Sequence, residues 1–261
     1  MKINIVYYIF INPDRDWKII VNGQINDLKI SKLNFEKLYV HICCEQRSLN
    51  NERSLNDERS LNEVSLIEDC KKLINKVTLN VVYSESYLNQ YEYPGLKLLY
   101  DLCQTEKDSI FLYMHSKGMV FNNPKNEKNE FQRNEFEKTT LRGTLYYHER
   151  AKYVFENIKF INKVGLWPSE KGFIWVNFFY IRSGYLKVPP IITNDRWWYE
   201  EYIGNIGNIG NGNYLDCYSL IKNKVCGIHP DLIKDDQILI NQINCNFNFG
   251  KVLLDKLHDN D

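Results

Sequence analysis

In the first half of the chain, short apolar segments alternate with segments whose apolar residues recur at helical spacing. The apolar segments have the length of buried strands and span 4–11, 36–44, 77–83 and 109–114. The helix-patterned segments span 17–33, 68–76 and 93–104. Such alternation is typical of βαβ units, whose strands form a parallel sheet. It predicts an α/β fold of Rossmann-like type, with a mixed, largely parallel sheet flanked by helices.

The second half contains fewer regular signals. Residues 136–161 are patterned as helix, and the segments 163–168 and 172–186 are predicted strands. A charged, Asn-rich stretch at 122–133 is predicted to be a loop. Asp195 is a suitable N-cap for a helix over 195–203. Short strands, Pro230 and a final polar helix are expected in the remainder.

Two repetitive stretches interrupt this pattern. Arg-Ser-Leu-Asn occurs three times with a period of six residues, and Ile-Gly-Asn recurs further along the chain. Neither period matches a solenoid repeat. We interpret both as low-complexity insertions in surface loops, at about 45–66 and 204–213, the first with transient helicity. The rest of 1–261 is predicted to be one domain.

Charge and cysteine content exclude several classes of protein. Lys plus Arg and Asp plus Glu are both 33, which argues against a nucleic-acid binder or a polybasic membrane protein. No apolar run approaches the roughly 20 residues of a membrane span. The N-terminal apolar segment is better explained as a first strand than as a signal peptide. Seven cysteines without a CxxC pair favour free thiols in the cytoplasm over a structural zinc.

The segment 109–118 ends a predicted strand with His115, Ser116, Lys117 and Gly118. Residues 115 and 117 share one side of an extended chain, and a glycine permits close backbone approach. An imidazole, an ammonium and a hydroxyl placed together could hold a diphosphate. The alternative is an ordinary strand end with a hydrogen-bonded histidine and a solvated lysine. In parallel sheets, ligands bind beyond the carboxyl ends of strands.

This segment resembles the "hydrophobic strand, then His-Thr-Lys-Gly" motif of a group of glycosyltransferase-like proteins from large DNA viruses and bacteria. Residues 91–103 resemble that group's Glu-x-Pro-Thr-Leu helix. Residues 172–190 resemble its Ser-Gly-Asn-Phe-Trp-Trp strand with the following Tyr-Leu and Leu-Pro, and 196–204 its Arg-x-x-x-Glu-x-Trp-Ile helix. The matches follow the group's order from about residue 8 to residue 204. The resemblance implies a GT-A fold and transfer of a sugar.

The sequence departs from the group's pattern at several positions. Gly95 stands where the group has Thr, and Trp175 and Val176 stand where it has Ser-Gly. Tyr202 replaces a Trp, and Arg142 is the candidate for an Arg that follows the His-Ser-Lys-Gly loop. These departures bear mainly on the shape of the predicted acceptor pocket and, to a smaller extent, on catalytic activity.

The resemblance assigns a nucleotide-sugar side to the site. His115 and Lys117 would stabilise the leaving diphosphate in place of the metal-binding Asp-x-Asp of other GT-A enzymes. The predicted binding residues on this side are Tyr8, Tyr83, Glu92, Ser116, Gly118 and His229. For Glu92, capping of the following helix is an equal alternative. We therefore expect weak or absent metal dependence and no certain cofactor, with a His115-bound Mn²⁺ or Mg²⁺ as the alternative.

The resemblance also assigns an acceptor side. Glu200 is the candidate base that deprotonates the acceptor hydroxyl, and its alternatives are a pair with Arg196 one turn away or a solvated carboxylate. The predicted acceptor-binding residues are Asn177, Arg196, Trp197 and Trp198. Core or rim packing is the ordinary explanation for each tryptophan, and a backbone hydrogen bond for the asparagine.

Together these features predict an inverting glycosyltransferase with a nucleotide-sugar donor, for which a UDP-sugar is the first candidate. The acceptor would be a glycan or glycoprotein hydroxyl. The alternative is a degenerate GT-A-fold protein that binds a nucleotide or glycan without turnover. The resemblance and the AT-rich codon bias suggest a large DNA virus and its host's cytoplasm.

Overall fold

The computed structural model describes residues 1–13, 16–44, 56–76, 80–87, 90–116, 127–204, 213–233 and 241–246, with the side chains of 56–62, 127–134 and residue 230 left aside. One eight-stranded sheet in the order β3-β2-β1-β4-β6-β5-β7-β8 organises these residues. The strands are β1 (Lys2–Ile11), β2 (Leu38–Cys44), β3 (Val81–Ser86), β4 (Ser109–His115), β5 (Lys163–Gly165), β6 (Phe179–Arg182), β7 (Cys217–Ser219) and β8 (Lys224–Val225).

Strands β1 to β4 pair in parallel, as do β5 and β7. Strand β6 is antiparallel to β4 and β5, and β8 is antiparallel to β7. The prediction of a mixed, largely parallel sheet flanked by helices is confirmed.

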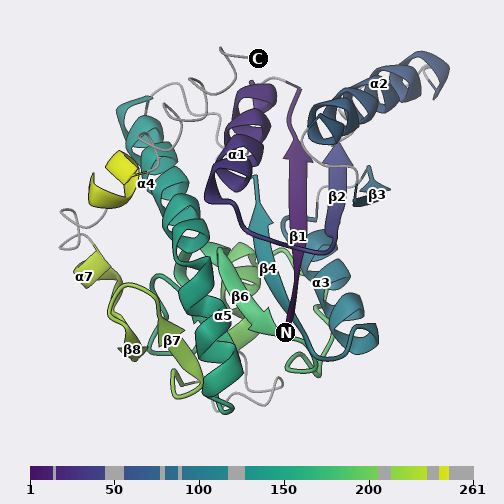
Figure 1. Cartoon of the computed structure of the whole chain (residues 1–261). Coiled ribbons are helices and arrows are strands. Elements are labelled where there is room, and N and C mark those ends of the chain that lie inside the picture. Colours follow the sequence, from purple (N-terminus) through teal and green to yellow (C-terminus); the bar gives the residue numbers. More distant parts are fainter. Residues whose placement is uncertain are drawn as a thin grey trace, which may run out of the picture.

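Helices cover both faces of this sheet. They are α1 (Trp17–Ser31), α2 (Asn56–Asn75), α3 (Tyr93–Thr105), α4 (Glu127–Tyr146), α5 (His148–Asn157), α6 (Arg196–Glu201) and α7 (Pro230–Ile233), with 3-10 turns η2 (Trp175–Asn177) and η3 (Tyr202–Gly204). The apolar residues of α1, α2, α4 and α5 share one core, and those of α3 and α6 share a second core on the opposite face. Figure 1 shows α1 and α4 crossing one face of the sheet.

The central strands read as continuous apolar runs because they are buried on both faces. In β1, Ile5 and Tyr7 enter the first core, while Val6 and Tyr8 enter the second. All seven residues of β4 are buried as well. These two neighbouring strands are therefore fixed from above and below, and their carboxyl ends form a rigid base for whatever binds there.

Three predictions about local structure need correction. Residues 127–133, predicted as loop, form the first turns of α4. The third Arg-Ser-Leu-Asn copy lies within α2, so the first insertion is helical from Asn56 onward, and its earlier part lies outside the described residues. Within 172–186 only Phe179–Arg182 is a strand, because 175–177 form a 3-10 turn. The predicted cap of α6 is confirmed, since Asp195 Oδ1 accepts the Trp197 N–H at 3.0 Å.

Two other predictions concern the chain ends and the membrane. The final part of the expected C-terminal helix lies outside the described residues. None of the described helices has the length and apolar character needed to cross a bilayer.

Candidate functional site

The candidate site lies at the carboxyl ends of β1 and β4. The chain builds β1, β2 and β3 in one direction and then places β4 on the other side of β1, so the strand order reverses between β1 and β4. Crevices at such reversals are where open α/β sheets bind ligands. Tyr8 and His115 are direct neighbours in register, and the Ser116 N–H donates to the Tyr8 carbonyl at 3.0 Å. The Ser116 hydroxyl accepts the Phe10 N–H at 2.8 Å, so this serine locks the two strand ends together.

Three polar side chains from distant segments meet beside this edge. Asn177 Nδ2 donates to Glu92 Oε2 at 2.8 Å, and Glu92 Oε1 lies 3.7 Å from His115 Nδ1. His115 Nε2 lies 3.2 Å from the Val176 carbonyl oxygen. A carbonyl only accepts, so Nε2 carries the hydrogen in this contact. We refer to Glu92, His115 and Asn177 as the edge cluster.

In the edge cluster His115 and Asn177 are buried and Glu92 is partly buried, and the cluster contains an unsatisfied polar atom. Asn177 is 1% exposed, and its Oδ1 has no hydrogen-bond partner among the described residues. The nearby Tyr113 hydroxyl is also buried and has no hydrogen-bond partner among the described residues. Burial, followed by the Glu92 carboxylate, raises the pKa of Tyr113 well above its ordinary value, so the phenol stays protonated and can donate. Buried polar atoms usually have partners, so this cluster has unused capacity to bind a polar ligand.

The backbone that carries Asn177 is strained. Val176 has φ of 72° and Asn177 has φ of 51°, in the left-handed region. Asparagine tolerates this region, but a β-branched residue there is an outlier. Val176 stands where the resembled group has Gly, the residue suited to this conformation. The same strained turn supplies the carbonyl that binds His115, so the strain lies within the site.

The packing of α3 explains Gly95, the other departure at this edge. A Cβ on Gly95 would lie 2.5 Å from Tyr8 Cβ and 2.8 Å from the Tyr113 hydroxyl oxygen. Tyr8 is fully enclosed, and burial raises the pKa of its phenol well above its ordinary value, with the Cys43 thiol as the next cause. Tyr8 therefore occupies the space that a Thr side chain at position 95 would need.

Helix α6 contacts the edge cluster through its backbone. The Tyr199 carbonyl accepts Asn177 Nδ2 at 3.3 Å, and the next residue, Glu200, is 6% exposed. Trp198 packs against the rings of Tyr199 and Tyr202, each at 5.4 Å between centroids. Three of the four predicted acceptor-binding residues and the candidate base thus lie on one helix beside the cluster, and the fourth, Asn177, belongs to the cluster.

The two remaining acceptor-side predictions also lie on α6. Arg196 is half-buried, and Trp197 is 64% exposed. The helix therefore packs the partly buried Trp198 against the second core and leaves Trp197 in solvent.

Three predicted residues lie elsewhere. Tyr83 packs on the opposite face of the sheet from Tyr8, where its hydroxyl donates to Asn75 Oδ1 at 2.8 Å. His229 is half exposed and lies 3.4 Å from the Asp231 carboxylate. The Arg142 guanidinium forms two 3.0 Å contacts with Asp27 on α1.

Lys117 and Gly118 lie outside the described residues. The structure therefore fixes the position of Ser116, the residue that precedes them, and the end of β4 from which they continue.

Sequence reasoning missed two residues of the site. Tyr113 precedes His115 by two positions on the same strand, so strand alternation could have identified it. Gln24 on α1 accepts the Tyr7 hydroxyl at 2.5 Å and donates to the His115 carbonyl at 2.9 Å. No local pattern marks Gln24, because its role depends on how α1 packs on the sheet.

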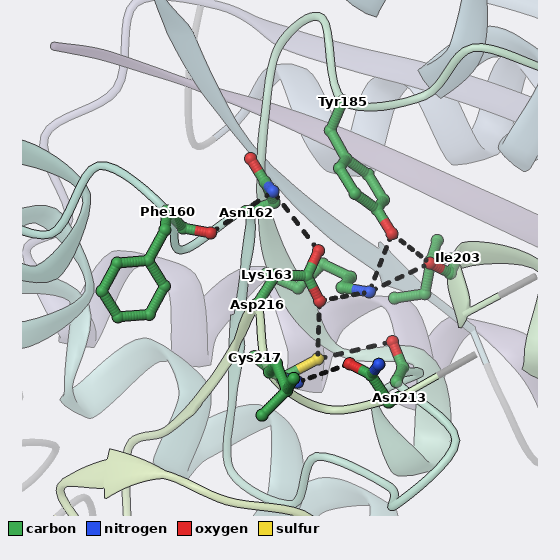
Figure 2. Close-up of polar contacts among 10 residues, drawn as sticks. Phe160, Asn162, Lys163, Tyr185, Ile203, Asn213, Asp216 and Cys217 are labelled. Carbon is green, nitrogen blue, oxygen red and sulfur yellow. Dashed lines mark hydrogen bonds and ion pairs between the residues drawn. The ribbon is translucent and has the colours of Figure 1, made fainter. Parts of the chain in front are cut away.

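A second buried polar group lies on β5, two strands from β4 (Figure 2). The Lys163 ammonium contacts Asp216 Oδ1 at 2.9 Å, the Tyr185 hydroxyl at 2.8 Å and the Ile203 carbonyl at 3.3 Å. These three acceptors match the three donors of an ammonium. Burial lowers the pKa of Lys163, but Cys217, Tyr185 and Asp216 outweigh it and raise the pKa overall. Lys163 thereby links η3 to Asp216, the residue before β7. These two segments lie on either side of the Ile-Gly-Asn stretch at about 204–213, which we call the Gly-Asn insertion.

His41 forms a third buried polar group, on β2. Its Nδ1 and Nε2 each lie 2.9 Å from a serine hydroxyl, those of Ser84 and Ser86 on β3. Burial lowers its pKa to about 4, against an opposing effect of Glu85. His41 is therefore neutral at physiological pH and joins two strands.

The described residues contain no group of three or more His, Cys, Asp or Glu side chains placed to hold a metal ion. Within the edge cluster, the groups able to bind a metal ion are the Glu92 carboxylate and the His115 imidazole.

Comparisons with known proteins do not identify a family for this chain. No family model and no curated protein matches the chain. Among solved structures, the chain is similar to S. aureus TarS 1–349, with a TM-score of 0.34 and 8% sequence identity. The match covers 70% of this chain and 47% of that chain, so it spans about half of the other protein's length. A likeness of this degree carries no argument about fold or function, and both rest on the topology and the site.

Proposed function

We propose that the chain is a glycosyltransferase that moves a sugar from a nucleotide-sugar donor to an acceptor hydroxyl. One observation carries the proposal. Glu92, His115 and Asn177 come from segments up to 85 residues apart and meet at the sheet edge where the strand order reverses. These residues also carry the motifs of the glycosyltransferase-like pattern. Buried polar groups assembled at that edge are expected of a ligand site.

The contacts of His115 favour a positioning role for that residue, and we propose a separate role for Lys117. Both ring nitrogens of His115 face protein groups, Nε2 the Val176 carbonyl and Nδ1 the Glu92 carboxylate. We therefore assign His115 to holding the strained turn and Glu92 in place. Lys117, two residues further on, is the cation that would stabilise the leaving diphosphate. Transfer would then need no metal at the leaving group.

The acceptor would bind on the α6 side. Glu200 is the proposed base, because it follows directly the residue whose carbonyl holds Asn177. It would take the proton of the acceptor hydroxyl as that oxygen attacks the anomeric carbon and the diphosphate leaves. Attack opposite the leaving group inverts the configuration. A UDP-sugar is the first donor to test.

Thermal-shift measurements with UDP, GDP, TDP, CMP and their sugar conjugates test this proposal, in Mn²⁺ and in EDTA. Ligand binding to the folded state raises the melting temperature. We expect a shift with one nucleotide class that persists in EDTA. A shift only in Mn²⁺ would contradict the metal-free mechanism, and no shift with any compound would contradict the donor site.

One observation favours a second function, binding without turnover. The edge-cluster side chains contact one another, and Val176 strains the turn where the resembled pattern has Gly. A degenerate site could retain nucleotide or glycan binding with this arrangement. Turnover assays on wild type and Lys117→Ala distinguish the two functions, since the second has no turnover to lose.

A further inference from the structure

The Tyr113 hydroxyl forms no hydrogen bond with the described part of the protein, although its side chain is completely buried. Tyr180, on the neighbouring strand β6, shows the ordinary arrangement, because its buried hydroxyl donates to the Thr144 carbonyl at 3.2 Å. Burial of a hydroxyl without a hydrogen bond lowers stability. A phenylalanine would fill the same space at position 113 without this cost, so the hydroxyl itself needs an explanation.

The structure holds this hydroxyl in one place. The Tyr113 ring stacks with Phe179 at 5.3 Å and with His115 at 6.0 Å between ring centroids. Its hydroxyl oxygen lies 2.8 Å from the point that a Cβ on Gly95 would occupy, in the first turn of α3. Glu92 directly precedes α3, and after burial its carboxylate is the next cause of the raised pKa of Tyr113. The hydroxyl is therefore fixed beside the edge cluster, in space that Gly95 leaves open.

The edge cluster lies between the two sides of the proposed reaction. His115 ends β4, the strand from which Lys117 continues, and Asn177 Nδ2 donates to the Tyr199 carbonyl on α6. In the proposed function, Lys117 binds the leaving diphosphate and Glu200 on α6 activates the acceptor hydroxyl. The transferred sugar must lie between these two groups, which places it at the edge cluster.

The polar groups at this place suit a sugar ring better than a diphosphate. The Glu92 carboxylate would repel the negative charge of a diphosphate. Asn177 Oδ1, like the Tyr113 hydroxyl, has no hydrogen-bond partner among the described residues. Sugar hydroxyls both donate and accept, and this set of groups offers both functions, because the carboxylate and Oδ1 accept while the phenol donates.

We propose that Tyr113 binds the transferred sugar, whose hydroxyls contact the Tyr113 hydroxyl, Asn177 Oδ1 and the Glu92 carboxylate. This inference rests on the proposed glycosyltransferase function. Glu92 is the partly exposed member of the set, with 15% of its side chain accessible, so this side chain turns aside to admit the sugar. A buried hydroxyl that pairs with one sugar hydroxyl also disfavours the deoxy sugar that lacks it.

Calorimetric titration of wild type and Tyr113→Phe tests the inference. UDP, GDP, TDP and CMP are titrated alone and as the conjugates UDP-glucose, UDP-N-acetylglucosamine, GDP-mannose, TDP-glucose and CMP-sialic acid. We expect Tyr113→Phe to bind the nucleotide as wild type does and the preferred conjugate about fivefold more weakly, because one hydrogen bond to an uncharged hydroxyl is lost. The melting temperature of the unliganded variant should stay the same or rise, because the hydroxyl has no partner in the described structure.

Tyr180→Phe is the matched control. It also removes one hydroxyl from a completely buried tyrosine, but this hydroxyl has a partner, and the side chain packs in the core on the opposite face of the sheet. We expect Tyr180→Phe to lower the melting temperature and to leave both affinities unchanged.

Two affinity results would overturn the inference. Either Tyr113→Phe binds the conjugate as tightly as wild type does, or it binds the nucleotide and the conjugate more weakly by the same factor. The first result with a lower melting temperature would show that the hydroxyl is purely structural. If wild type binds none of the nucleotides, the proposed donor site fails and this inference fails with it, so the two failures are distinguishable.

Discussion

Val176 is the residue whose conformation fits its side chain least well. At φ of 72° a valine is strained, and it lies directly beside the buried amide of the edge cluster. Gly is normally about 0.5–1 kcal/mol worse than Ala inside regular structure, but it is favoured at positive φ. We therefore expect Val176→Gly to be more stable than Val176→Ala by about 1 kcal/mol in chemical denaturation.

The same pair of substitutions at Val82 is the control. Val82 is 50% exposed on the edge strand β3, where the ordinary order should hold and Ala should be the more stable. If Gly is also the less stable residue at position 176, the strained turn is not as described here.

His41 makes stability depend on pH. Its pKa is about 4 in the folded chain, below the ordinary value of 6.5. Between these values the unfolded chain binds a proton that the folded chain excludes, so stability falls as the pH drops from 6.5 to 4. The full loss is up to about 3 kcal/mol. Melting temperatures across this range should fall more steeply for wild type than for His41→Gln, and parallel slopes would contradict the assignment.

At the scale of elements, the two residues that flank the Gly-Asn insertion, Gly204 and Asn213, both lie against Gly172. A Cβ on Gly172 would lie 2.3 Å from the Asn213 carbonyl oxygen, and one on Gly204 would lie 3.0 Å from the Gly172 carbonyl carbon. Both ends of the insertion thus pack against one residue. Loop closure depends weakly on length, so deletion of one copy, 205–207, should change stability by less than about 0.5 kcal/mol in urea unfolding.

Lys163→Met is a comparison variant for this deletion, because we expect it to lower the free energy of unfolding much more. It leaves the Asp216 carboxylate without the ammonium that ties the base of the insertion together, and should cost about 3–5 kcal/mol. If the deletion destabilises the chain as much as Lys163→Met does, the insertion is part of the packed fold and our interpretation of it is wrong.

At the scale of the whole molecule, the sequence predicted the sheet better than the site. The runs that became β1 and β4 are long and apolar, because both faces of these strands are buried. Tyr8 and Tyr83 both follow apolar runs, yet they lie on opposite faces, because side-chain direction depends on register. His41 pairs with Tyr8 and with Ser84, so Tyr83 faces the other way. No single strand's pattern contains this information.

The edge cluster was predicted as separate residues and not as a unit. Glu92 lies at the start of α3, and Asn177 lies in a turn that was expected to be strand. Their contact depends on the antiparallel β6 returning to β4, a long-range pairing that local patterns do not encode. The helix at 127–133 was missed because its charged, Asn-rich composition is equally typical of a loop.

Binding of a nucleoside diphosphate at the carboxyl edge of β4 is tested by calorimetric titration. The diphosphate that gives the largest thermal shift is titrated into wild type, Lys117→Ala and Lys107→Ala. Lys107 is an exposed lysine before the amino end of the same strand, and so is a matched control. We predict that Lys117→Ala weakens binding at least about tenfold, roughly 1.4 kcal/mol, while Lys107→Ala binds as wild type does. Equal affinities for the two variants would show that Lys117 does not bind the diphosphate.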